Sequence, residues 1–227
     1  MYTLKLVLDI QKDMRNRWKA CNKTSHWVNR KEKIDQDIVE KISWKTEEQA
    51  YEFLLSYLQK YYKDNVNSIN NTINFGQQII DNDIDMACQT LEEITGKPIY
   101  RKDFIWYITT FPRWPYDYEK WYIRLYYNRS IKYYIGIFLH ELLHFQFIHH
   151  YKNREPVVSL TNEQFEFLKE SMTIILNHEC KQFLWKPDTW YSIHRGLREI
   201  LEKFWTTNKN FDDFVVYWCN QVKKIIT

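Results

Sequence analysis

The chain has 227 residues, of which 44% are hydrophobic, 18% aromatic and 27% charged, with four glycines and five prolines. This composition excludes a disordered or low-complexity chain and favours a compact, helix-rich fold. The 32 basic and 29 acidic residues leave a net charge of +3, and no long basic block is present. The charge pattern therefore predicts neither a nucleic-acid partner nor a membrane-surface partner.

Cysteine usage and the N-terminus bear on where the protein works. The cysteines stand singly, so neither a zinc ribbon nor a thioredoxin-type motif is present, and free buried thiols are expected. Within residues 1–15, charged side chains interrupt the apolar run too early for an export signal. No apolar stretch of the chain reaches the roughly 20 residues that cross a bilayer. We therefore expect a cytoplasmic protein.

The N-terminal part of the chain is predicted to combine one strand with helices. Residues 3–10 alternate between apolar and polar side chains, which is the pattern of a strand. A capping box at Thr46 is followed by apolar residues at steps of three and four, which predicts a helix to about Lys63. The asparagine-rich segment 64–75 is expected to be a loop, and residues 76–95 a second helix that ends at a glycine.

The pattern then changes to strands. Residues 104–109 and 121–127 are rich in β-branched and aromatic residues, and a proline-containing turn, residues 112–117, separates them. We expect these segments to form a small antiparallel sheet. With the helices on either side, they predict an α+β fold that is mostly helical.

A buried helix is predicted over residues 130–150, where an apolar and aromatic run follows Ser130, a suitable N-cap. It contains the motif H-E-x-x-H as His140, Glu141 and His144. Residues four apart lie on one face of a helix, so both imidazoles can bind one metal ion while Glu141 reaches the next coordination position. Burying these groups without partners would be costly, and a metal ion supplies the partners.

This motif is typical of zinc hydrolases. Two histidines and a third protein ligand bind Zn²⁺, and a water in the open position has a pKa of roughly 7. Glu141 would be the general base that takes a proton from the zinc-bound water and later delivers one to the leaving amine. A helix whose histidines hydrogen-bond within the core is the alternative explanation.

Glu163 and Glu170 compete for the third ligand position on the next predicted helix, which a capping box at Thr161 begins. They lie roughly 10 Å apart along the helix, so both cannot bind one ion. Glu163 lies in the first turn, where the helix dipole alone favours an acidic residue. The helices predicted after the motif are residues 162–181, residues 187–205, and one from Asn210 to the C-terminus.

Glu170 is our prediction for the third ligand because of its surroundings on the helix. It lies in a polar stripe with Glu166, Thr173 and Asn177, and this stripe contains no lysine or arginine. A stripe that ends in hydrogen-bonding side chains suits a metal-binding face. An ordinary solvated surface would explain the same pattern.

Two resemblances bear on this choice. The eighteen residues between His144 and Glu163, and the pair Asn162-Glu163, resemble the aminopeptidase-type gluzincins. The stretches HELLHFQF, LKESMTIILN and WYSIHRGLRE, over roughly the C-terminal half, are similar to recurring blocks of small bacterial proteins with an H-E-x-x-H helix. In those proteins the Lys-Glu pair of the second block, here Lys169-Glu170, contains the apparent third ligand.

The resemblance to zincins implies a minimal zincin-like core, with a small sheet above the H-E-x-x-H helix and an edge strand that pairs with an extended peptide. The chain would be a single domain, with a lobe of sheet and helices at 1–129 and a helical metal-binding lobe at 130–227. Many gluzincins orient a ligand histidine with an acidic residue four positions after the third ligand. Ile174 stands there, so Asn177 or Thr173 would take this role.

Related peptidases supply an oxyanion donor from a downstream tyrosine or histidine, which makes Tyr191 and His194 the catalytic candidates beside the general base. Asp188 would orient His194. Arg198 would either receive a substrate carboxylate or form a salt bridge. Simple packing is the alternative for both candidates.

The sequence therefore predicts a cytoplasmic zinc metallopeptidase of the gluzincin type, which holds Zn²⁺ with His140, His144 and Glu170 and acts on a peptide or protein substrate. One alternative is a metal-binding or regulatory protein that keeps the zincin fold without turnover. Another is a helical interaction module without metal. No nucleic-acid or membrane partner is expected, and nothing in the pattern indicates an oligomeric state.

Overall fold

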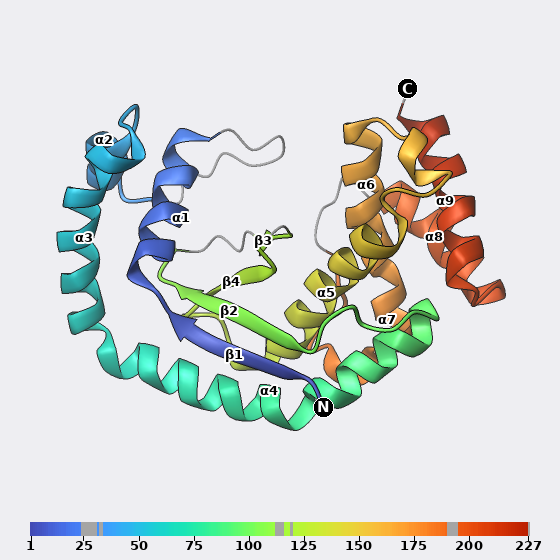
Figure 1. Ribbon diagram of the computed structural model, residues 1–227, viewed down its shortest axis with the longest axis horizontal. Coiled ribbons are helices and arrows are strands. Elements are labelled where there is room, and N and C mark those ends of the chain that lie inside the picture. Colours follow the sequence, from blue (N-terminus) through green and yellow to red (C-terminus); the bar gives the residue numbers. More distant parts are fainter. Residues whose placement is uncertain (24–30, 32–33, 112–115, 119, 190–194, 227) are drawn as a thin grey trace. The chain divides into compact units, whose positions relative to one another are not determined.

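The computed structural model describes residues 1–23, 31, 34–111, 116–118, 120–189 and 195–226. Over these residues the fold is α+β and mostly helical, as predicted (Figure 1). No helix among them is long and apolar enough to cross a membrane. The strands are β1 (Thr3–Leu8), β2 (Asp103–Thr109), β3 (Tyr116–Asp117) and β4 (Tyr122–Tyr126). The helices are α1 (Ile10–Asn22), α2 (Gln36–Ile42), α3 (Glu47–Asp64), α4 (Val66–Thr95), α5 (Tyr134–Tyr151), α6 (Asn162–Met172), α7 (Leu176–Glu179), α8 (Arg195–Thr207) and α9 (Phe211–Ile225).

The chain divides into two compact units, each assembled from separate segments. The sheet unit consists of Leu4–Ile79 and Asp103–Ile131, and the α5 unit consists of Met1–Thr3, Ile80–Lys102 and Lys132–Thr227. Helix α4 begins in the sheet unit and ends in the α5 unit. The predicted lobes, residues 1–129 and 130–227, differ from this division mainly in the placement of residues 80–102.

The sheet has the strand order β1-β2-β4-β3 among the described residues. Strand β2 pairs in parallel with β4, with Ile105 opposite Tyr122 and Thr109 opposite Tyr126, and β3 pairs antiparallel with β4. The sheet is therefore mixed, and the prediction of a purely antiparallel sheet was wrong. Residues 110–121, which connect β2 to β4, have about the dozen residues that a parallel crossover needs, so the two strands need not form a hairpin.

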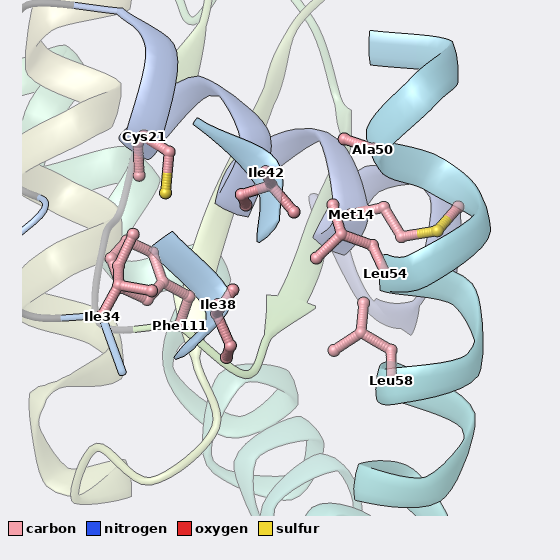
Figure 2. Packing of buried hydrophobic residues seen from close by; sticks show 10 residues of the cluster. Met14, Cys21, Ile34, Ile38, Ile42, Ala50, Leu54, Leu58 and Phe111 are labelled. Atoms are coloured by element: carbon pink, nitrogen blue, oxygen red, sulfur yellow. The ribbon is translucent and has the colours of Figure 1, made fainter. Parts of the chain in front are cut away.

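Helix α1 packs against both β2 and α3 in the sheet unit. The sequence did not predict it because α1 buries Asp13, Asn16 and Arg17, which weakens its apolar periodicity. Figure 2 shows the apolar cluster in which α1, α2 and α3 meet. Its buried members are Met14, Ala20, Cys21, Ile34, Ile38, Ile42, Ala50, Leu54, Leu58 and Phe111.

Helix α4 begins at Val66, so the prediction of a loop over residues 64–75 was wrong. Ile69 in this segment is buried, and the hydroxyl of Thr72 donates to the carbonyl of Tyr127 at 3.0 Å. These tertiary contacts outweigh the weak helix propensity of the asparagines. The helix ends at Thr95, directly before Gly96, as the sequence predicted, and the φ of Gly96, 62°, lies in the left-handed region that glycine favours.

Helix α6 packs against α5, α8 and α9 in the α5 unit. Both bonds of its predicted capping box at Thr161 are present. The helix ends at Met172 and a 3₁₀ turn, Thr173–Ile175, follows, so the predicted continuous helix to residue 181 is interrupted. Near this helix end, the carbonyl of Glu170 accepts from the hydroxyl of Thr173 at 3.1 Å and from the guanidinium of Arg198 at 3.3 Å.

Candidate metal centre

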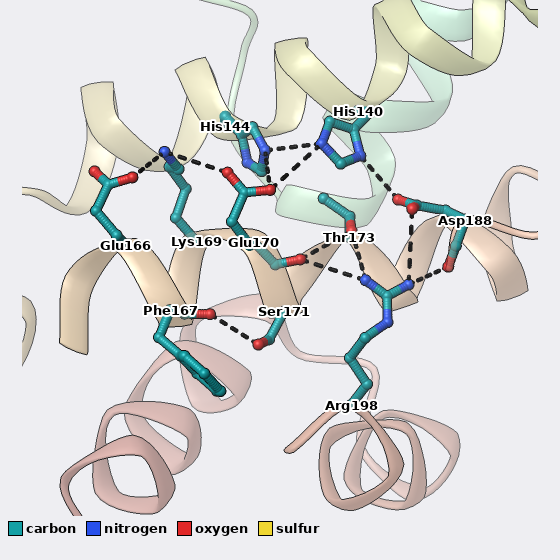
Figure 3. Close-up of polar contacts among 10 residues, drawn as sticks. All are labelled: His140, His144, Glu166, Phe167, Lys169, Glu170, Ser171, Thr173, Asp188 and Arg198. Atoms are coloured by element: carbon teal, nitrogen blue, oxygen red, sulfur yellow. Dashed lines mark hydrogen bonds and ion pairs between the residues drawn. The ribbon is translucent and has the colours of Figure 1, made fainter. Parts of the chain in front are cut away.

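Helix α5 carries the H-E-x-x-H motif in its buried middle. It begins at Tyr134, later than predicted, and Ser130 is not its N-cap. The residues His140, Glu141 and His144 are 4%, 6% and 1% exposed. The one-turn spacing brings the Nε2 atoms of the two histidines within 3.0 Å of each other (Figure 3).

Helix α6 brings Glu170 to the same point. Its Oε2 lies 3.7 Å from Nε2 of His144 and 3.9 Å from Nε2 of His140. A tetrahedral ion with Zn–N of about 2.0–2.1 Å and Zn–O of about 2.0–2.2 Å separates its ligand atoms by roughly 3.3–3.5 Å. The three edges of this triangle, 3.0, 3.7 and 3.9 Å, bracket that separation. The residues therefore fit a metal ion of this size.

Glu163 does not join this group. It lies in the first turn of α6 and is exposed. Among the described residues, the group that could hold a metal consists of His140, His144 and Glu170, whose ligand atoms lie within 4.8 Å of one another. The geometry favours Glu170 over Glu163, in agreement with the choice made from the polar stripe.

Asp188 contacts His140 on the ring nitrogen that faces away from the proposed metal position. Its Oδ2 lies 2.8 Å from Nδ1 of His140, and both side chains are buried. A carboxylate in this position favours the proton on Nδ1, which leaves the Nε2 lone pair for a metal. The expectation that Asn177 or Thr173 orients the histidine was therefore wrong. Asp188 takes this role, and it is 48 residues from His140 in the sequence.

Asn177 and Arg198 hold Asp188 in place. The Asn177 side chain accepts from the backbone N–H of Asp188 at 2.6 Å and donates to its carbonyl at 3.0 Å. Arg198 also donates to the Asp188 carbonyl, and to the hydroxyl of Thr173 at 2.9 Å. Arg198 is buried and its guanidinium is engaged, so of its two predicted roles the structure favours the internal salt bridge.

Lys169 was not predicted as part of the site. Its side chain is 2% exposed, and its Nζ lies 2.6 Å from Oε2 of Glu166 and 3.5 Å from Oε1 of Glu170. The polar stripe contains no lysine in sequence, but the neighbouring Lys169 folds back onto it. The signal in the sequence that could have pointed to Lys169 was its place directly before Glu170, the predicted third ligand.

Burial and neighbouring charges shift the titration of the site. Burial alone would lower the pKa of His140, but the Asp188 carboxylate outweighs this and raises it to about 9. Burial lowers the pKa of His144 to about 4 and raises the pKa of Glu141 to about 7. Burial would also raise the pKa of Glu170, but the contact with His144 holds it well below its usual range. Asp188 thus stabilises positive charge at His140, whether a proton or a bound metal ion supplies that charge.

Glu141 has an incompletely paired carboxylate. Its Oε2 is buried and has no hydrogen-bond partner among the described residues. A buried polar atom without a partner is costly, and a catalytic role or a bound ion or water is among the explanations for one. This oxygen therefore fits the position predicted for a general base.

Tyr191 and His194, the predicted oxyanion donors, lie outside the described residues, so their prediction stays open. The predicted placement of the sheet above α5 also stays open, because the two are in different compact units. Comparison of the chain with models of known protein families, with curated proteins and with solved structures finds no match.

Proposed function

We propose that this protein is a zinc-dependent hydrolase with a zincin-like core, and that its substrates are peptides. The observation that carries the proposal is the convergence of three ligand atoms, Nε2 of His140, Nε2 of His144 and Oε2 of Glu170, in one buried place. Two imidazole nitrogens and one carboxylate oxygen form the donor set typical of catalytic zinc sites, which use three protein ligands and keep one position open.

The surroundings support zinc over the hard cations. Ca²⁺ and Mg²⁺ prefer oxygen ligands, often carboxylates and carbonyls, whereas imidazole suits zinc and other transition metals. The hydrogen bond from His140 to Asp188 is the arrangement that commonly supports a zinc-bound histidine. Within the described residues, His140 and His144 are the two imidazoles that approach Glu170.

Each residue has a separate role in the proposed reaction. Zinc, when bound, would polarise a carbonyl and lower the pKa of a coordinated water. Glu141 accepts the proton that the attacking water loses and passes it to the leaving amine, which its buried, unpartnered Oε2 permits. His140, His144 and Glu170 hold the ion, and Asp188 keeps the His140 ring in the required orientation. The H-E-x-x-H motif is most often used for peptide bonds, so we propose peptides as the substrate class.

Metal content and turnover together test this proposal. We expect the purified protein to hold about one zinc per chain and to cleave members of a mixed peptide library. Glu141→Gln keeps the size of the side chain but removes the base, so zinc should remain while hydrolysis falls by at least roughly two orders of magnitude. A protein that binds zinc without cleaving any peptide would be a metal-binding protein, and one that binds no zinc would refute the centre.

A further inference from the structure

Lys169 is buried beside the proposed metal ligand. Its side chain is 2% exposed, although lysines are almost never fully buried without a partner. Its closest acidic partner, Glu166, has a side chain that is 52% exposed. An ion pair with so exposed a glutamate could form at the surface, where the ammonium would keep its water. Glu170, the other acidic side chain beside Lys169, is 19% exposed and lies next to the proposed ligand histidines.

The two oxygens of the Glu170 carboxylate face different groups. Oε1 lies 3.5 Å from the ammonium of Lys169, whereas Oε2 lies 3.7 Å from Nε2 of His144 and 3.9 Å from Nε2 of His140 (Figure 3). Of the lysine and arginine side chains in the described residues, Lys169 is the one that pairs with this carboxylate. Arg198 donates instead to the backbone carbonyl of Glu170.

We propose that Lys169 is a positioning residue that makes Glu170 a one-oxygen ligand of the metal. A carboxylate can bind a cation through one oxygen or through both. The ammonium attracts Oε1 and turns only Oε2 toward the histidines, so a fourth position remains open for water or substrate. This inference rests on the proposed metal centre.

The visible absorption of the Co²⁺-substituted protein tests the inference, because four-coordinate Co²⁺ absorbs more strongly than five-coordinate Co²⁺. We expect the wild type to give the intense spectrum of a four-coordinate ion. Lys169→Met keeps the length of the side chain but removes its charge, so Glu170 is free to bind through both oxygens. The absorption per bound cobalt should then fall toward that of a five-coordinate ion.

Lys203→Met is the matched control, because Lys203 is an exposed lysine on helix α8. Its spectrum should equal that of the wild type. An unchanged spectrum in folded, cobalt-loaded Lys169→Met would overturn the role of Lys169 and leave the metal centre intact. A wild type that takes up no Co²⁺ would instead refute the centre itself.

A measurement on the wild type keeps the inference testable if Lys169→Met does not fold. X-ray absorption, or a crystal structure of the cobalt-loaded protein, should find one Glu170 oxygen at bonding distance. Two Glu170 oxygens bound in the wild type would overturn the proposal. Lys169→Gln, which keeps a neutral donor near Oε1, should give a spectrum between those of the wild type and Lys169→Met.

Discussion

Each compact unit buries a polar cluster, and the two clusters differ in how their atoms are paired. In the sheet unit, the Asp13 carboxylate accepts hydrogen bonds from the hydroxyls of Thr109, Thr110 and Tyr62 and from the backbone N–H of Thr110. Arg17 donates to the carbonyl and the hydroxyl of Thr110 at 3.1 and 2.9 Å. The donors of the protein itself thus satisfy this carboxylate.

In the α5 unit, atoms that can bind a metal ion meet instead. Nε2 of His140, Nε2 of His144 and Oε2 of Glu170 point toward one another, and Oε2 of Glu141 has no partner among the described residues. Two imidazole nitrogens and a carboxylate oxygen this close together are costly to bury unless positive charge, from a proton or from a metal ion, lies among them. The difference between the units therefore separates a polar cluster that stabilises a fold from one that is suited to bind a cation.

Among the changes that test this difference between the two clusters, removal of a ligand histidine should have the largest effect on metal binding. In His144→Ala two of the three ligands remain, and two ligands rarely hold zinc, so elemental analysis of protein purified without chelator should find nearly all the metal lost. His149→Ala, at an exposed position of the same helix, should keep its zinc. Full zinc content in His144→Ala would remove the central claim.

Changing the third ligand should have the next largest effect. Glu170→Ala should weaken zinc binding at least roughly tenfold in a competition titration, because it leaves two histidines where three protein ligands are the rule. Glu163→Ala should leave the affinity unchanged and cost only a few tenths of a kcal/mol of stability, since this residue is exposed at the helix start. The reverse order would assign the ligand to Glu163.

Asp188→Asn should weaken zinc binding roughly tenfold, the lower end of the effect expected for a residue that orients a ligand. The amide keeps the shape of the side chain but no longer favours the proton on Nδ1 of His140. Asp213→Asn, at an exposed position of α9, is the control for the loss of one acidic charge. Equal affinities in both variants would show that the 2.8 Å contact does not tune the centre.

The cluster of the sheet unit should show the smallest effect on metal binding. Asp13→Asn replaces an acceptor by an amide that cannot pair with all the surrounding donors. We expect the unfolding free energy, measured with urea, to fall by about 1–3 kcal/mol. Zinc affinity should not change. A folded Asp13→Asn protein with reduced zinc affinity would contradict the division of roles between the two clusters.

The sequence by itself determined the features that depend on near neighbours in the chain. The pairing of His140 with His144 follows from their spacing on a helix, and the capping boxes at Thr46 and Thr161 follow from contacts over three residues. Glu170 could be preferred to Glu163 because helical position is also a local property. The helical, α+β character of the fold follows from periodicity in the same way.

Only the tertiary structure decided which distant segments meet. It paired β2 with β4 in parallel, extended α4 through the asparagine-rich segment, and placed Asp188 against His140. It also buried Lys169, although lysine side chains are rarely buried in proteins. Spacing along the chain contains no information on these contacts, because they depend on how packed elements orient side chains that are many residues apart.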